Sequence, residues 1–291
     1  MRTIIIAEIG ECFNGDMNTA RRLMEAASEA GCDIVKFQIL DMDEVAADDP
    51  EYEWFAKIAI SPEMVNTFIG WAEELDIGIL FTPVSVRTAS WLTEAGIRKV
   101  KIASSFVAKS DLLEYINENF DTVYASTGMA ELNEIDKMHR FLRQVKDIRL
   151  MHCISEYPTG PLLEQRGLVA MNEVDAHLNM MILLKQRYPE FIVGYSDHTD
   201  GIFVPTVAVA MGAEIIEKHI TLDRVTPINH FVNHLGYMGT DHVVSIEPDR
   251  LKEMVSQIRR IEKIKGDMKW ERSPGEKVLM EFLKSRYKER R

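Results

Sequence analysis

The chain has 291 residues, 46% of them hydrophobic, so it can bury a sizeable core. There are 46 acidic residues against 34 basic ones, a formal net charge of −12 that argues against nucleic acid or another polyanion as a partner. The 3 cysteines lack CxxC spacing and indicate free thiols. No run approaches the ~20 apolar residues of a membrane span, and the first apolar run is too short for a signal peptide. We therefore expect a cytoplasmic protein with no membrane partner.

Short strand-like runs alternate with helical patterns along the chain. The first strand is expected at 3–10, and a helix at 18–31 ends on a glycine of the kind that stops helices. A strand at 33–38 follows, and the next helix, 61–78, begins with a serine cap and a proline. Further strands are expected at 78–85, 99–104, 122–127, 148–153, 192–197 and 214–221. Further helices are expected near 87–95, 110–118, 133–145, 175–187, 201–211 and 248–265.

Eight strands that alternate with helices imply a parallel sheet, and their number favours closure into a single (β/α)8 TIM barrel of the α/β class. We expect the barrel domain to span 1–268 and a C-terminal helical tail to span 269–291. The stretches 158–174 and 222–247 are longer than barrel loops need. Both leave the C-terminal face of the barrel, so they are candidates for a lid or a substrate wall.

The parallel strands of a barrel end at one mouth, so their terminal polar residues form one candidate site. These residues are Glu8, Lys36, Gln38, Thr82, Ser85, Lys101, Ser104, Ser126, Thr127, Cys153, Ser155, Ser196, Asp197, His198, Lys218 and His219. Lysines inside strands cost stability unless an anion compensates them. Lys36 and Lys101 therefore indicate a cradle for phosphate or carboxylate, with hydroxyl groups from the serines nearby.

Two histidines, His198 and His219, end adjacent predicted strands and could share one divalent ion with open positions for substrate. The competing interpretation of the histidines is that they are hydrogen-bonded structural residues. The competing interpretation of the lysines is that they reach out to solvent. Asp197 could cap the next helix. We expect His152 to face the core or a helix, and the acidic stretch 41–53 to be a solvated loop.

Several motifs, in this order, resemble those of the sialic acid synthase family. Between residues 3 and 265 they are "AEIG", "AGCDIVKFQ", "FTPVS", "KIAS", "STGM", "HCISEYPT", "VGYSDHT", "GAEIIEKHITLDR" and "DHVVSIEP". The resemblance implies a TIM-barrel transferase of carbohydrate biosynthesis that condenses phosphoenolpyruvate with a sugar-derived aldehyde. Phosphate would leave by C–O cleavage, and the product would be a 2-keto-3-deoxy acid of the nonulosonic type.

The resemblance also implies roles for individual residues. A divalent metal would lie between His198 and His219, with Mn²⁺ expected first and Mg²⁺ or Co²⁺ as alternatives. The phosphoenolpyruvate site would comprise Lys36, Lys101, Ser104, Ser126 and Ser196. The catalytic candidates are Glu8, Asp241 and Lys101, and the further substrate-binding candidates are Tyr157, Ser155 and Gln38.

The chain departs from the family pattern where the sugar should bind. Cys12 and Phe13 replace an Asn-His pair, Phe106 replaces a glutamate, and Ser155 replaces an asparagine. We also expect the catalytic barrel without the C-terminal antifreeze-like domain of the family, and a homodimer as a possible assembly. We therefore expect an acceptor other than N-acetylmannosamine. The alternatives are a metal-dependent aldolase or lyase acting on a keto acid, and a non-catalytic relative that binds phosphoenolpyruvate.

Overall fold

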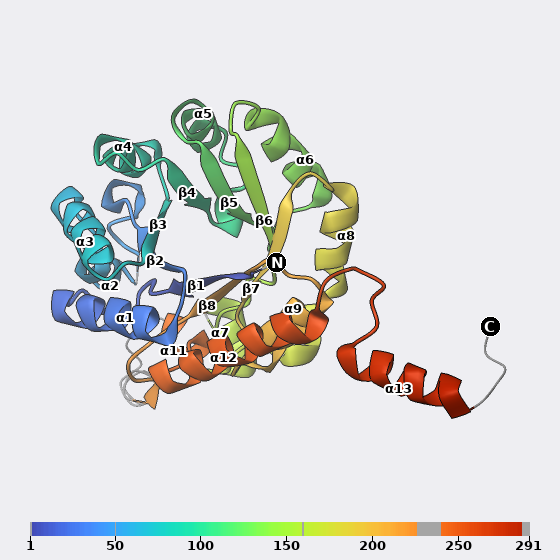
Figure 1. Ribbon diagram of the computed structural model, residues 1–291. Coiled ribbons are helices and arrows are strands. Elements are labelled where there is room, and N and C mark those ends of the chain that lie inside the picture. Colours follow the sequence, from blue (N-terminus) through green and yellow to red (C-terminus); the bar gives the residue numbers. More distant parts are fainter. Residues whose placement is uncertain (1, 50, 159, 226–239, 287–291) are drawn as a thin grey trace.

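The computed structural model describes residues 2–49, 51–158, 160–225 and 240–286, and its centre is a barrel of parallel strands (Figure 1). Helices surround these strands on the outside, as the sequence predicts. The strands are β1 (Ile4–Glu8), β2 (Ile34–Ile39), β3 (Gly78–Pro83), β4 (Lys99–Ile102), β5 (Thr122–Ser126), β6 (Asp147–Cys153), β7 (Ile192–Asp197) and β8 (Ile215–His219).

The order of hydrogen-bonded strands is β3-β2-β1-β8-β7-β6-β5-β4, and all the pairs are parallel. The first and last strands are therefore joined directly, with Glu8 opposite His219 in the register. β3 and β4 end the order and lie side by side, so the barrel is nearly closed. The predicted TIM barrel is confirmed.

The helices that follow the strands also match the prediction, with shifts at their ends. α1 begins where the Asp16 side chain accepts hydrogen bonds from the N–H groups of Asn18 and Thr19, and ends at Gly31 in a left-handed conformation. These helices are α1 (Met17–Ala30), α3 (Pro62–Glu74), α4 (Val86–Glu94), α5 (Ser110–Asn119), α6 (Leu132–Phe141), α8 (Asn179–Arg187), α9 (Phe203–Met211) and α12 (Pro248–Lys265).

The acidic stretch 41–53 was expected to be a solvated loop, and this prediction is wrong at both ends. Asp41 is buried, because it accepts a hydrogen bond from Ser85 and pairs with Arg87. After the short 3-10 helix η1 (Met42–Glu44), the stretch runs into α2 (Tyr52–Ile58), which buries Trp54. Burial of one aromatic ring and one paired carboxylate outweighs the acidic composition.

The two long loops contain short helices. α7 (Gly160–Arg166) and the 3-10 helix η3 (Glu173–Ala176) follow β6, and α11 (Asp241–Val244) closes the loop after β8. Residues 226–239 of that loop lie outside the described residues. The 3-10 helix η2 (Ser104–Phe106) follows β4.

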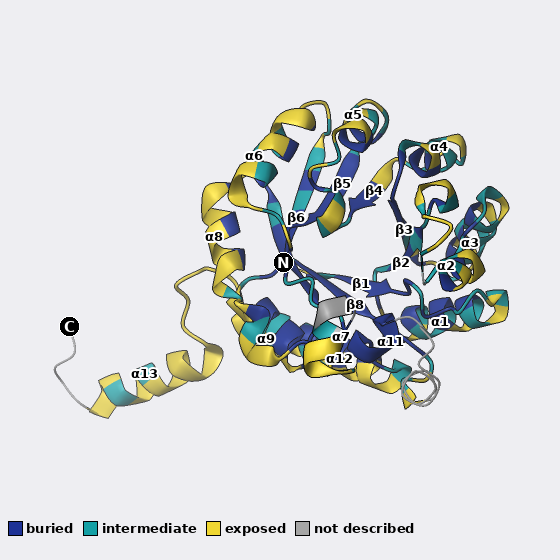
Figure 2. Ribbon diagram, turned by 180° about the vertical axis from the view of Figure 1, so that it is seen from behind, coloured by how far each residue is buried: buried dark blue, intermediate teal, exposed yellow. Residues whose placement is uncertain are grey.

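The predicted C-terminal tail contains α13 (Pro274–Arg286), and residues 287–291 lie outside the described part of the chain. α13 extends away from the barrel, and its described residues are not buried (Figure 2). Over the described residues, no helix combines the length and apolarity that a lipid bilayer requires.

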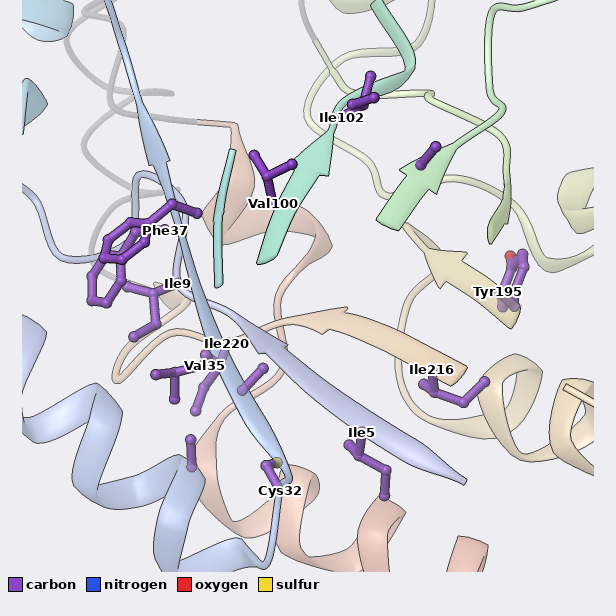
Figure 3. Close-up of a cluster of buried hydrophobic side chains, with 14 of the residues drawn as sticks. Ile5, Ile9, Cys32, Val35, Phe37, Val100, Ile102, Tyr195, Ile216 and Ile220 are labelled. Carbon is purple, nitrogen blue, oxygen red and sulfur yellow. The ribbon is translucent and has the colours of Figure 1, made fainter. Parts of the chain in front are cut away.

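Alternation along the strands separates two apolar layers. Side chains such as Ile5, Val35 and Ile216 lie on the outer face of the strands and pack against the helices (Figure 3). Inside the barrel, a second cluster comprises Ile6, Leu80, Tyr124, Met151 and Ile215. The residues two positions further along the same strands are polar and share the inner face. They are Glu8, Thr82, Ser126, Cys153 and Glu217. The mouth of the barrel is therefore polar directly above a dry apolar floor.

A substitution of Gly194 on β7 tests how tightly the barrel is packed. A Cβ atom there would lie 2.4 Å from the carbonyl oxygen of Ile215, closer than atoms can approach. We expect Gly194→Ala to lower the free energy of unfolding by about 1–3 kcal/mol, as overpacking does. Urea denaturation followed by circular dichroism measures the change.

Gly70→Ala on α3 is the matched control, because no atom lies within 4 Å of its added Cβ. In a helix interior this change should raise stability by roughly 0.5–1 kcal/mol. Equal stability of the Gly194 and Gly70 variants would contradict the close approach of β7 and β8.

Candidate active site at the mouth of the barrel

The first pair of charges at the mouth joins neighbouring strands. Glu8 lies opposite Lys36 in the β1–β2 register, and Lys36 Nζ is 3.0 Å from Glu8 Oε2. Lys36 also donates a hydrogen bond of 3.3 Å to Thr82 Oγ1 on β3. Both side chains are buried, so this contact forms away from bulk water.

Glu217 on β8 is a site residue that the sequence analysis missed. Its Oε1 lies 3.3 Å from both Lys36 Nζ and Lys101 Nζ, and it accepts a 3.0 Å hydrogen bond from Ser196 Oγ. The buried Oε2 of Glu217 has no hydrogen-bond partner. A signal was present in the sequence, because Glu217 is two residues before His219 and must share its face of the strand. One carboxylate oxygen thus joins the residues predicted to hold phosphoenolpyruvate.

These contacts set the protonation of the carboxyl groups. Burial alone would raise the pKa of Glu217, but Lys101 and Lys36 outweigh it and lower that pKa to about 2. Burial raises the pKa of Glu8 to about 8, and the charges of Glu217 and Asp241 add to the effect against the attraction of Lys36. Burial lowers the pKa of Lys101. Of these two carboxyl groups at the mouth, Glu217 is therefore ionised and Glu8 binds a proton below about pH 8.

The two histidines converge on one point. Tyr157 Oη lies 2.7 Å from His198 Nε2 and 3.2 Å from His219 Nε2. His198 Nδ1 donates a 2.8 Å hydrogen bond to the carbonyl oxygen of Ile154, which orients the ring with Nε2 towards Tyr157. Burial and the charge of His198 lower the pKa of His219 well below its usual value, which favours a neutral His219 ring. The pKa of His198 itself is raised, because Cys153 and the Ile154 carbonyl outweigh the effect of burial.

The converging Nε2 atoms have the chemistry of metal ligands, since neutral imidazoles bind divalent ions and a carbonyl that orients one ring is a common support. Within the described ranges, no group of three or more His, Cys, Asp or Glu side chains is arranged to hold a metal. A divalent ion held by His198 and His219 would therefore keep several positions for water or substrate. The pair fits the predicted metal in this sense.

Asp241 approaches the histidines from the long loop after β8. Its Oδ2 lies 3.5 Å from His219 Nδ1 and accepts a 3.0 Å hydrogen bond from the N–H of Glu11. The approach depends on Gly10, which has a φ of +47°, because a Cβ there would lie 2.2 Å from Asp241 Oδ2 and 3.0 Å from Glu8 Oε1. The glycine of the "AEIG" motif thus lets two catalytic candidates share one side of the mouth.

Glu11 is a second residue that the sequence analysis missed. Its Oε2 accepts a hydrogen bond of 3.2 Å from Trp54 Nε1 on α2. Burial raises the pKa of Glu11 well above its usual value, and the charge of Asp241 raises it further. Its position depends on Trp54, some forty residues away in the chain, so no local pattern indicates it.

Some of the other predicted site residues have a hydrogen-bond partner in the protein, and others have none. Ser104 and Ser155 lie 2.6 Å apart through their hydroxyl oxygens, and Ser155 also contacts Cys153 Sγ at 3.3 Å. Ser126 Oγ is buried and has no hydrogen-bond partner. Gln38, half-buried, follows Lys36 on the same face of β2. A buried hydroxyl without a partner is what a ligand-binding position leaves when the ligand is not bound.

Two residues expected near the mouth lie on the outer face of the strands. Asp197 and Lys218 form an ion pair of 2.7 Å, and both side chains are fully buried. Asp197 also accepts hydrogen bonds from Thr199 rather than capping α9, whose N-cap residue is Ile202. The proposed cap is therefore wrong, because a strand residue next to an inward-facing one must point outward.

Other side chains at the strand ends support the scaffold. Ser85 caps α4, and Thr127 donates to the carbonyl of Met151. His152 lies 2.8 Å from the carbonyl oxygen of Ala176, so its predicted position facing the core is confirmed.

The unusual residues of the "GECFNGD" stretch also face the core. Phe13 packs edge-on against Phe37 and Phe68, and Cys12 Sγ lies 3.4 Å from Ser245 Oγ. Phe106 packs, partly buried, against the hydrophobic core. Cys12 and Phe13 therefore pack into the core rather than line the mouth.

This combination of a parallel barrel, buried lysines and carboxylates, and paired histidines defines an enzyme-like mouth suited to an anionic substrate. The NeuB family model matches residues 23–270, so the chain belongs to this family of sialic acid-type synthases. It is 34% identical to N,N'-diacetyllegionaminic acid synthase of Campylobacter jejuni over 91% of this chain and 78% of that protein. It is 30% identical to N-acetylneuraminate-9-phosphate synthase of Drosophila melanogaster over 87% and 66% of the two chains.

A solved structure agrees with this assignment. The crystal structure of N-acetylneuraminic acid (sialic acid) synthetase from Leptospira borgpetersenii superimposes with a TM-score of 0.84 and 31% identity. The match covers all of this chain and 94% of that one. The sequence-based assignment to the sialic acid synthase family is therefore confirmed.

Glu217→Gln should destabilise the barrel, because it leaves two buried lysines without their shared counter-ion. We expect the free energy of unfolding to fall by about 3–5 kcal/mol near pH 7. The low pKa of Glu217 adds stability that is present above pH 4.5 and is lost as the pH falls towards 2. The difference in the free energy of unfolding between wild type and variant should therefore become smaller as the pH falls. Denaturant titration at several pH values measures it.

Glu118→Gln, on the exposed face of α5, removes the same charge and should leave stability almost unchanged. A Glu217 variant that is as stable as the Glu118 variant would show that the two lysines do not depend on the carboxylate.

Proposed function

We propose that the chain condenses phosphoenolpyruvate with a sugar-derived aldehyde, giving a 2-keto-3-deoxy acid of the nonulosonic type and phosphate. The observation that carries this proposal is the buried cluster of Lys36, Lys101 and Ser196 around Glu217, beside the paired histidines. The names of the relatives, N,N'-diacetyllegionaminic acid synthase and N-acetylneuraminate-9-phosphate synthase, support the same reaction class.

Phosphoenolpyruvate carries a carboxylate and a phosphate, and the inner face of the barrel offers cations and hydroxyls for both. Lys36 and Lys101 supply the charge, and Ser126 supplies a buried hydroxyl without another partner. Ser196 and Ser104 add donors at neighbouring strand ends. The apolar floor beneath excludes water and strengthens each electrostatic contact.

His198 and His219 would hold a divalent ion, for which Mn²⁺ is proposed and Mg²⁺ or Co²⁺ are alternatives. Such an ion, when bound, supplies Lewis-acid polarisation of the aldehyde oxygen. The chain itself orients the His198 ring through the Ile154 carbonyl. It also places Asp241 next to His219.

The C3 atom of phosphoenolpyruvate then attacks the aldehyde carbon, and a C–C bond forms as positive character develops at C2. The ionised Glu217, which contacts both lysines, would stabilise that charge. Glu8, which binds a proton below about pH 8, can donate it to the new alkoxide. Water adds to C2 and loses a proton, for which Asp241 is a candidate acceptor. In the collapse of this intermediate the C2 hydroxyl loses its proton and becomes the keto group, the C–O bond to the phosphorus-bearing oxygen breaks, and phosphate leaves with that proton.

Replacement of His198 by Ala should abolish turnover and metal binding while folding is retained, since the ring lies at the mouth rather than in the core. Activity is measured as phosphate released from phosphoenolpyruvate with a panel of aldehydes, with and without Mn²⁺ or a chelator. The His139→Ala variant, on α6, is the control and should keep its activity. Undiminished turnover by the chelated wild-type enzyme would contradict the metal role.

The same assay separates the alternatives. Turnover with pyruvate in place of phosphoenolpyruvate would indicate an aldolase or lyase. Binding of phosphoenolpyruvate without phosphate release across the panel would indicate a non-catalytic relative.

A further inference from the structure

A fully buried ion pair lies directly behind the paired histidines. Asp197 and Lys218 each precede one of the two histidines in the chain, and they lie opposite each other in the β7–β8 register. Asp197 Oδ2 is 2.7 Å from Lys218 Nζ, and both side chains are fully buried. Tyr195 and Ile216, two residues earlier on the same strands, share this outer face (Figure 3). The pair is therefore next to the predicted metal ligands in the chain but points away from the mouth.

Lys218 binds both of the residues that flank His198. Its ammonium group pairs with the carboxylate of Asp197 and donates a hydrogen bond to the carbonyl oxygen of Thr199. Thr199 in turn donates a 2.8 Å hydrogen bond from its hydroxyl group to Asp197 Oδ1. One side chain of β8 thus holds the segment of β7 on either side of a histidine.

The ring of His219 depends on its backbone for its position. Among the described residues, its buried Nδ1 has no hydrogen-bond partner, whereas Nδ1 of His198 is bound to a carbonyl oxygen. The carbonyl oxygen of His219 accepts a 3.0 Å hydrogen bond from the N–H of Ile246, and Lys218 anchors the residue before it. The separation of the two imidazole rings therefore follows from how the ends of β7 and β8 are fixed to each other.

Stability alone does not account for this ion pair. Removal of two charges from water costs several kcal/mol per ion, and apolar residues of similar volume are often neutral or stabilising in place of a buried pair. Apolar side chains, however, make no directional bonds. The bonds of Asp197 and Lys218 select one arrangement of the two strand ends.

We propose that Asp197 and Lys218 are positioning residues, which fix the separation of the His198 and His219 rings and thereby set the affinity for the divalent ion. This inference rests on the metal role in the proposed function. Residues that orient metal ligands from behind typically contribute about 10–100-fold to metal affinity. The affinity for phosphoenolpyruvate should depend far less on the pair, because the two lysines assigned to that substrate come from β2 and β4.

The main test removes both charges at once, so that neither is left buried and alone. Asp197→Asn together with Lys218→Met keeps the volumes and an acceptor for the Thr199 hydroxyl, so we expect a folded protein, which thermal melting checks. Isothermal titration calorimetry of the metal-free protein should give a Kd for Mn²⁺ that is roughly tenfold or more above that of the wild type. The Kd for phosphoenolpyruvate, measured by the same method, should change far less. A folded double variant with the wild-type Kd for Mn²⁺ would overturn the inference.

A second variant alters the geometry but keeps the charges. Lys218→Arg retains a cation for Asp197, but the planar guanidinium cannot reproduce both bonds of the ammonium group. We expect it to weaken Mn²⁺ binding severalfold. Loss of the folded state in this variant and in the double variant would assign the pair to the stability of the barrel, and would also reject the positioning role.

The control breaks an ion pair at the other end of the barrel. Arg259 on α12 lies 3.0 Å from Asp33, which immediately precedes β2. We expect Arg259→Met to lower the melting temperature but to keep the wild-type Kd for Mn²⁺. Equal weakening of Mn²⁺ binding in this variant would show that any loosening of the barrel has the same effect, and would remove the specific role of Asp197 and Lys218.

Failure of the proposed function has a different signature in the same titrations. A wild-type protein that binds none of Mn²⁺, Co²⁺ and Mg²⁺ would contradict the metal role, and the positioning role would be rejected with it. If the wild type binds Mn²⁺ and His198→Ala does not, the metal role holds. Wild-type affinity in the double variant would then reject the positioning role alone.

Discussion

Two lysines inside a barrel are tolerable because one carboxylate oxygen faces both of them. Glu217 lies 3.3 Å from Lys36 and from Lys101, above a floor of buried apolar side chains. Removal of a charge from water is costly, and close opposite charges compensate only part of the cost. The cluster therefore holds cations ready for an anionic substrate, and this readiness is the feature on which the proposed chemistry depends.

A simple alternation along the strands is enough to place this cluster at the mouth. Each strand contributes an apolar residue to the floor and, two positions later, a polar residue to the mouth. Loops then bring in groups that strands cannot supply, such as Asp241 from the loop after β8. Gly10 makes that approach possible, because any side chain at this position would collide with the carboxylate of Asp241. The strand residues and the loop residues meet around His198 and His219.

The sequence predicted the barrel and much of the mouth because strand alternation is a local property. Lys36, Lys101, Ser196, His198 and His219 share the inner face as expected. Glu217 was overlooked although the same alternation identifies it. Glu11 and α2 could not be found in this way, since their placement depends on a contact between Trp54 and Glu11. The outward position of Asp197 shows the converse error, in which nearness in sequence was taken for a shared site.

The adjacent charges of β8 have a further consequence for how the chain folds. Glu217 joins the lysines inside the barrel, whereas its neighbour Lys218 pairs with Asp197 on the outer face. A slip of one residue in the pairing of β8 would exchange the two faces. Lys218 would then meet Lys36 and Lys101, and Glu217 would meet Asp197, so both clusters would become repulsive. Two oppositely charged neighbours thus encode the alignment of the last strand, independently of any role in catalysis.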